Sequence, residues 1–277
     1  MVNKVAGTFP ATFWGMDGMR TIKLIIQYDG TDFSGWQVQP RKRTVQETLE
    51  QVLAKILNEK IHVVAASRTD AGVHALGQVA HFHTHNSISC RRLLAALNGL
   101  LPADMAVLRV QQTSSSFHAI KNARRKTYRY LLWNSPVRAP LLANRVWHVW
   151  ESLNVKAMKS GARHLFGVHD FSAFRGANSD TKTSVRKIEK ISIRFSEKIL
   201  KIEITGNGFL KYMVRNIVGT LVEVGKGKRT PEDIKKILAS KDRRKAGAPA
   251  PACGLYLVKI DYGLAGGGLA AGVDGSL

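Results

Sequence analysis

Hydrophobic residues recur along the chain in short alternating runs and at helical spacing, which predicts a mixture of strands and helices. Residues 21–28 read TIKLIIQY, a run of β-branched and apolar residues that predicts a strand. Thr44 and Glu47 have the spacing of a capping box, and apolar residues at helical spacing follow from Leu49, so a helix is expected there. Further strands are expected at 61–66, 78–82 and 105–111, and a helix at 91–98 with Gly99 as its C-terminal cap.

The second half of the chain repeats this mixture. Strands are predicted at 127–133, 145–150, 188–195, 199–204 and 254–260, and helices at 155–166, at 209–224 and from Thr230 onward. Because both halves mix the elements in a similar order, we expect an α+β protein of two related units, although no sequence repeat accompanies them. The expected parts are an N-terminal extension at 1–20, halves at 21–113 and 114–262, and a flexible Gly/Ala tail at 263–277.

The charge balance narrows the class of partner. The chain has 42 Lys and Arg against 20 Asp and Glu, which gives a net charge of +22 and a pI near 10.3. Since 44% of the residues are hydrophobic, the chain can build a core and is not a disordered basic tail. A polyanion is therefore the expected partner, with nucleic acid ahead of an acidic membrane surface.

Neither a membrane span nor an oxidising compartment is indicated. No apolar run approaches the roughly 18 residues needed to cross a bilayer. Residues 1–20 lack the continuous apolar core of a signal peptide. Cys90 and Cys253 are the only cysteines and form no C-x-x-C pair, so neither a zinc ribbon nor a disulfide framework is expected. We therefore expect a protein of the reducing cytoplasm.

A loop between two expected strands carries the clearest candidate for chemistry. Asp70, at the end of Arg68-Thr69-Asp70, is the only carboxylate between Lys60 and Leu101. The surrounding cations favour its ionised form, and an Asp nucleophile needs only an electrophile held in place. A simpler interpretation makes Asp70 a turn residue that bonds its own backbone and pairs with Arg68. Spacing alone leaves both interpretations open.

Three histidines raise the alternative of a metal site. His81, His83 and His85 alternate at the end of an expected strand, so their side chains could share one face. No acidic ligand lies nearby in sequence, and Cys90 is the only close thiol. A half-buried or exposed role in the strand explains the histidines equally well.

Aromatic and basic residues offer a possible RNA contact. Tyr128 and Tyr130 would lie on one face of a strand, with Arg129 on the other. They could stack an unpaired base, or at least one of them could pack in the core. Arg215 lies inside the apolar helix expected at 209–224, where a buried Arg needs a partner such as Asp70 unless it faces solvent.

Taken together, these stretches resemble the tRNA pseudouridine synthase A family over residues 22–262. The resemblance is carried by YDGTDFSGWQ at 28–37, SRTDAGVHALGQVAHF at 67–82, FHA at 117–119, YRY at 128–130, DFSAFR at 170–175, MVRNIVG at 213–219 and GLYL at 254–257. It implies a mixed, mainly antiparallel sheet in two similar α/β halves with an RNA-binding cleft between them. The implied activity is isomerisation of uridine to pseudouridine at positions 38, 39 and 40, in the anticodon stem-loop of tRNA.

The resemblance also implies roles for single residues. Asp70 would be the catalytic carboxylate, paired with and oriented by Arg215. Tyr128 would pack against the target base, and Arg68 would displace the target uridine and fill its place. RNA contacts are implied at Arg68, Phe117, His118, Lys121, Asn178 and Lys182. The chemistry would need no cofactor and no metal, and the enzyme would be a homodimer in which one tRNA touches both subunits.

Two departures from the family pattern and two rival functions stay open. Ser67 stands where the family usually has Gly, and Ile120 stands where a basic residue is common, with Lys121 beside it to compensate. A non-catalytic RNA-binding protein would need only the charge and the aromatic residues. A metal-dependent RNA hydrolase would be built on His81 and His83.

Overall fold

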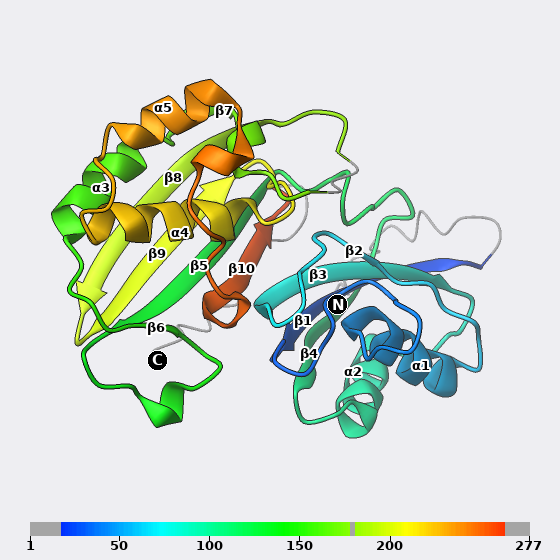
Figure 1. The fold of residues 1–277 in the computed structure, drawn as a ribbon. Helices are drawn as coiled ribbons and strands as arrows, with labels where there is room; N and C mark the ends of the chain where they lie inside the picture. The colour runs from blue at the N-terminus through cyan, green and yellow to red at the C-terminus, as the bar shows by residue number, and fades with distance from the viewer. Residues whose placement is uncertain (1–17, 178–180, 264–277) are drawn as a thin grey trace, which may run out of the picture.

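The computed structural model describes residues 18–177 and 181–263, in which the chain forms five α-helices and one sheet of ten strands (Figure 1). The strands are β1 (Arg20–Tyr28), β2 (Val64–Ala65), β3 (His74–Thr84), β4 (Met105–Thr113), β5 (Arg125–Asn134), β6 (Trp147–Val149), β7 (Gly167–Asp170), β8 (Val185–Ser196), β9 (Ile199–Gly206) and β10 (Leu255–Asp261). The helices are α1 (Val45–Leu57), α2 (Cys90–Leu100), α3 (Val155–Arg163), α4 (Met213–Gly225) and α5 (Asp233–Ser240). None of the helices in these residues is both long and apolar enough to cross a membrane.

The first half packs two helices on one face of its strands. β1 lies between β3 and β4 and is antiparallel to both. Alternate residues of β1 are buried in one core with Leu49 of α1 and Leu93 of α2 (Figure 1). The helix start expected from the capping box is confirmed, since the Thr44 hydroxyl accepts from the Glu47 N–H at 3.4 Å.

The second half has a similar layering. β5, β9, β8 and β7 are antiparallel neighbours, and α3, α4 and α5 lie on one side of them (Figure 1). Nearly all of α4 is buried, including Met213, Ile217 and Leu221, so this helix forms the centre of the second core. The expected α+β class and the mixed, mainly antiparallel sheet are therefore confirmed.

The last described strand joins the two halves. β10 pairs in parallel with β3, where Tyr256 lies opposite His74, and antiparallel with β5, where Leu257 lies opposite Tyr128. A single sheet in the order β4-β1-β3-β10-β5-β9-β8-β7 results. The junction of the halves is thus a strand pairing and not a flexible linker, while the predicted boundary at 113/114 stays a prediction.

Two local expectations for the first half were wrong. The strand expected at 61–66 is reduced to β2, because side chains of α1 bond the backbone of Val63: Glu50 accepts its N–H at 2.8 Å and Gln46 donates to its carbonyl at 3.3 Å. Gly99 does not cap α2 but lies inside it. The helix ends at Leu100, and the next residue, Leu101, is extended because the following Pro102 disfavours the helical conformation.

The structure of the second half also differs from the prediction in two places. The helix expected from residue 209 begins only at Met213, because Tyr212 adopts a left-handed conformation with φ 60°. β7 was not predicted, since this edge strand has only four residues and its Val168 is exposed. Both features depend on neighbours that are distant in sequence.

The close approach of α4 to the segment around residue 248 gives a test of the fold. A Cβ on Gly219 would collide with the carbonyl oxygen of Ala248. We expect Gly219→Ala to lower the free energy of unfolding by about 1–3 kcal/mol, the usual cost of overpacking. Gly99→Ala is the matched control, because a Cβ there meets nothing within 4 Å and should add up to about 1 kcal/mol. Urea unfolding of both variants measures the difference, and equal stability would contradict the packing.

Candidate active site

The loop that carries Asp70 is held by the loop that follows β1. The N–H of Trp36 donates to the carbonyl of Thr69 at 3.0 Å, and the N–H of Gly72 donates to that of Phe33 at 3.2 Å. Gly35 has φ 97°, and a Cβ there would lie 2.8 Å from the Thr69 carbonyl oxygen. The backbone of the Asp70 loop can lie this close only because residue 35 has no side chain.

A second set of bonds holds the loop from beneath. Gln78 of β3 is fully buried and bonds the backbone of Ser67 twice, donating to its carbonyl at 2.5 Å and accepting its N–H at 3.3 Å. The hydroxyl of Tyr28 lies 2.8 Å from that of Thr69. Buried polar groups that are fully bonded fix one conformation, so the position of Asp70 is set by the sheet below it.

Asp70 meets Arg215 across the junction of the halves. The Nη1 of Arg215 lies 3.5 Å from the Oδ2 of Asp70, and both side chains are mostly buried, with 15% and 25% of their surface exposed. Arg215 is itself fixed, because its Nε donates to the carbonyl of Ala250 at 2.7 Å and its guanidinium lies 4.8 Å from the ring centre of Tyr212. The contact proposed from the sequence between Asp70 and Arg215 is therefore present.

The charge of Asp70 is set by two opposing effects. Burial raises the pKa of its carboxyl, while Arg215 and, more weakly, Lys211 lower it. The net direction is upward, so burial outweighs the nearby cations on which the sequence argument rested. A carboxylate with a raised pKa beside a fixed cation is a frequent arrangement at reactive sites.

Tyr128 lies next to the same loop. Its hydroxyl is 2.9 Å from the Ser67 hydroxyl, and its ring meets that of Phe209 edge-on at 5.1 Å between centroids. Burial raises the pKa of Tyr128 to about 12, so it stays protonated near neutral pH. The expected alternation along β5 is confirmed: Tyr130 is fully buried, while Arg129 on the other face pairs with Glu203 at 2.9 Å.

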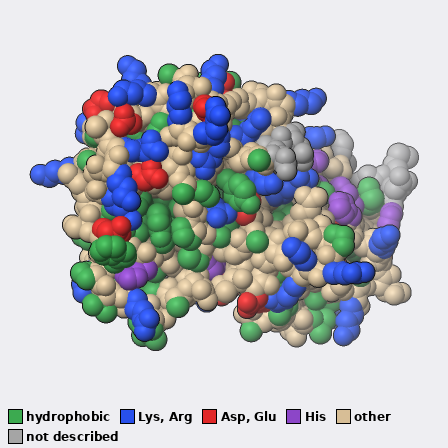
Figure 2. All heavy atoms as spheres, viewed as in Figure 1, with side chains coloured by type: hydrophobic (Ala, Val, Ile, Leu, Met, Phe, Trp, Pro, Cys, Tyr) green, Lys and Arg blue, Asp and Glu red, His purple; other side chains and the backbone are tan. Residues whose placement is uncertain are grey.

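The expected RNA contacts lie on several elements. Arg68, Lys121 and Lys182 are exposed, whereas Phe117 and His118 are partly buried. Phe117 packs against Tyr262 at 5.2 Å, and the ring of His118 accepts backbone N–H groups of its own turn. Asn178 lies outside the described residues. Figure 2 shows Lys and Arg side chains over much of the visible face, in keeping with the net charge.

The histidines of β3 have local structural partners. His81 is buried, accepts the N–H of Ala119 at 3.3 Å, and has its pKa lowered to about 4 by burial and by His118 and His83. His83 bonds the hydroxyl of Thr21 at 3.0 Å. Within residues 18–177 and 181–263, no three His, Cys, Asp or Glu side chains gather as a metal ion would require.

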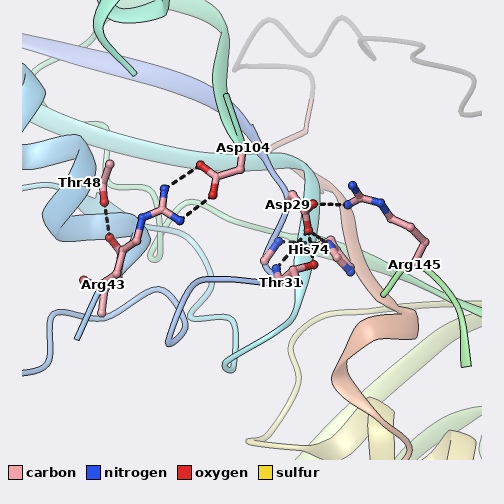
Figure 3. A network of polar contacts seen from close by, with 9 residues as sticks. Asp29, Thr31, Arg43, Thr48, His74, Asp104 and Arg145 are labelled. Carbon is pink, nitrogen blue, oxygen red and sulfur yellow. Dashed lines mark hydrogen bonds and ion pairs between the residues drawn. The ribbon is translucent and has the colours of Figure 1, made fainter. Parts of the chain in front are cut away.

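A polar network next to the Asp70 loop was not foreseen. Asp29, at the end of β1, lies between His74 and Arg145, at 3.0 Å from the Nδ1 of His74 and 2.5 Å from the Nη1 of Arg145 (Figure 3). The Nε2 of His74 reaches the carbonyl of Cys253 at 3.1 Å, and its ring stacks on Tyr256. Asp29 and His74 belong to the family motifs at 28–37 and 67–82, but nothing in the sequence indicates that Arg145 contacts Asp29.

The raised pKa of Asp70 predicts how this residue affects stability. The native state keeps the Asp70 proton to a higher pH than the unfolded chain, so stability falls as pH rises between the two pKa values. We therefore expect Asp70→Asn to raise the free energy of unfolding at neutral pH, and to have little effect below the ordinary Asp pKa of about 3.9. Urea unfolding at the two pH values measures both effects.

The exposed Asp32 provides the control for this substitution. Asp32→Asn makes the same chemical change at the surface and should alter stability by no more than about 0.5 kcal/mol. An Asp70→Asn protein less stable than the wild type at neutral pH would mean that the attraction of Arg215 outweighs burial.

Comparison with known proteins agrees with the resemblance. A sequence model of the tRNA pseudouridine synthase family matches residues 24–120 and 162–263. Proteins named tRNA pseudouridine synthase A from Acetivibrio thermocellus and Pelobacter propionicus are 48% and 46% identical over 244 residues, which cover 88% of this chain and 100% of each relative. Among solved structures, a Cbf5-Nop10-Gar1 complex superposes with a TM-score of only 0.32 at 14% identity, covering 72% of this chain and 54% of that one. On the strength of the sequence matches, this chain belongs to the tRNA pseudouridine synthase family.

Proposed function

We propose that this protein isomerises uridine to pseudouridine at positions 38, 39 and 40 in the anticodon stem-loop of tRNA, with Asp70 as the catalytic carboxylate. The observation that carries the proposal is the contact between Asp70 and Arg215, in which a fixed cation from the second half orients a mostly buried carboxylate of the first. We infer the reaction from membership of the tRNA pseudouridine synthase family, and the high positive charge of the chain suits an RNA substrate.

The reaction requires the target base to leave its stack. Flipping costs a few kcal/mol, which basic contacts along the arm offset. Arg68 is exposed two residues before Asp70, where its side chain can take the place of the displaced base. Phe117, His118, Lys121, Asn178 and Lys182 complete the proposed RNA contacts.

The chemistry exchanges a C–N bond for a C–C bond within one nucleotide. Asp70 assists cleavage of the N-glycosidic bond by attack at C1′, by attack at C6, or by removing the 2′ proton to give a glycal. The detached uracil turns and rejoins through C5, so the pocket must hold it and exclude water. Tyr128 packs against the base in this proposal, and no cofactor or metal takes part.

Two further parts of the proposal come from the resemblance. The enzyme acts as a homodimer, so that one tRNA touches both subunits, and it works in the cytoplasm. Light scattering of the full chain reads the oligomeric state, and a monomer at working concentration would remove the first part.

Loss of the carboxylate tests the assignment of Asp70. We expect Asp70→Asn to abolish pseudouridine formation in unmodified tRNA and to leave tRNA affinity within a few-fold, since the substitution is nearly isosteric. Mapping of the product to single nucleotides, with excess chelator present, measures activity, position and metal dependence together. Asp32→Asn, the same change at an exposed site, should remain active.

The rival functions predict other outcomes of this experiment. Binding of tRNA without modification by the wild type would favour a non-catalytic RNA-binding protein. Loss of activity in chelator would favour the metal-dependent class. Substantial activity of Asp70→Asn would rule out Asp70 as the catalytic group.

Removal of the partner cation should change the pH profile. Arg215 lowers the pKa of Asp70, so Arg215→Met should raise that pKa, by about one unit or more for a close opposite charge. Because the ionised carboxylate is the active form, activity is lost as pH falls through this pKa, and the acid limb of the single-turnover rate should move to higher pH. Arg215→Lys should shift it less. An unchanged limb with a lower plateau would mean that Arg215 acts only by position.

A further inference from the structure

Two basic side chains converge beside the aromatic residues of the site. Lys126 lies near the start of β5, on the same face as Tyr128, and pairs with Gly206 at the end of β9. On its other side Gly206 pairs with Ile188 of β8, and Arg186 precedes Ile188 by two residues on that face. The register therefore places Lys126 and Arg186 on one face, separated by the end of β9.

Phe209 and Arg186 lie close to the backbone at this end of the sheet. A Cβ on Gly206 would lie 3.3 Å from the Cζ of Phe209, and one on Gly208 would lie 3.6 Å from the Cδ and Nε of Arg186. The ring of Phe209 and the side chain of Arg186 thus lie directly on the backbone of this loop. Since Phe209 also meets Tyr128 edge-on, the two cations border the aromatic pair of the proposed base pocket.

Neither cation has a carboxylate partner in the described part of the chain. The Nζ of Lys126 donates to the carbonyl of Ala66 at 2.7 Å, and the Nη1 of Arg186 donates to the carbonyls of Thr183 and Val185 at 3.0 and 2.6 Å. Some other partly buried cations are paired with acids, among them Arg129 with Glu203, Arg215 with Asp70, and Lys226 with Glu151.

The free protein therefore holds two like charges together at a cost. Burial, and secondarily Arg186, lowers the pKa of Lys126 to about 8, and burial also lowers the pKa of Arg186. An anion between the two side chains would remove both penalties at once, because it restores to each cation the stabilisation that burial took away.

We propose that Lys126 and Arg186 together bind one backbone phosphate of the RNA, next to the flipped nucleotide. This inference rests on the proposed function, which supplies the polyanion. Lys126 donates to the carbonyl of Ala66, which directly precedes Ser67 and Arg68 in the chain. The bound phosphate would therefore sit at the entrance of the Asp70 loop. A backbone phosphate fits because its oxygens share one negative charge and can accept from Lys and Arg at the same time.

Binding of an anticodon stem-loop RNA by full-length protein tests the site. In an Asp70→Asn background, which prevents turnover, we expect Lys126→Met and Arg186→Gln each to weaken binding about tenfold. Each should also reduce the slope of log K against log salt by about 0.7–0.9, the loss of one phosphate contact. The double variant should reduce the slope no further, because both residues hold the same phosphate. Lys159→Met, on the exposed side of α3, is the control and should leave affinity and slope unchanged.

RNAs with one neutral methylphosphonate linkage locate the phosphate. At one linkage next to the target uridine, neutralisation should remove the difference in RNA affinity between Lys126→Met and its parent. Lys126→Arg, which keeps the positive charge, should bind the unmodified RNA as the parent does. Penalties that persist at every linkage would overturn the proposal, as would variants that bind like the Lys159→Met control.

Single-turnover rates distinguish phosphate binding by Lys126 from an effect of Lys126 on the Asp70 loop. With Asp70 intact, Lys126→Met at saturating RNA should keep its single-turnover rate. A slower rate with unchanged affinity would mean that Lys126 acts through Ala66 and the loop, which overturns phosphate binding. A wild type that modifies no tRNA overturns the proposed function, whereas an active wild type with unaffected Lys126→Met and Arg186→Gln binding overturns this inference alone.

Discussion

The pairing of β10 with both β3 and β5 is the constraint on which the site depends. Asp70 belongs to the loop that leads into β3, while Tyr128 belongs to β5 and Arg215 to the helix packed above it. These residues come close only because one strand fixes the distance between the halves. The stacking of His74 on Tyr256, the bond of His74 to the Cys253 carbonyl and the ion pair of Asp29 with Arg145 reinforce the same junction.

The charged side chains around the site are partly buried, and they differ in whether the protein supplies an opposite charge. Asp70 is buried enough to raise its pKa, yet Arg215 keeps the ionised form accessible. Arg215 avoids the cost of a lone buried cation by bonding both Asp70 and the Ala250 carbonyl. Lys126 and Arg186 differ, because their described partners are neutral carbonyls. On our proposal, the substrate supplies the charge that the protein leaves out.

Much of the fold could be read from local sequence signals. The capping box at Thr44 and the alternation around Tyr128 reflect physics within a few residues, and the structure confirms both. The conformation of Val63 depends on its bond to Glu50, and Tyr212 packs against Gly176; both partners are distant in sequence, so no local pattern contains them. The family motifs brought Asp70 and Arg215 together before any geometry was known. Arg145 and Arg186 had no such signal, since their significance lies in which charges they meet or lack.

The position of β10 in the chain has a consequence for how the protein is made. Residues 20–113 form strands and helices that pair with one another, so this half can gain structure while the ribosome is still translating the rest. The junction must wait for residues 255–261, whose contact with β3 closes a very long loop and forms slowly. A nascent chain interrupted before Leu255 would carry the basic surfaces of both halves without the strand that aligns Asp70 with Arg215. Such a product would lack the contact between Asp70 and Arg215, so this contact can form only after β10 has been synthesised.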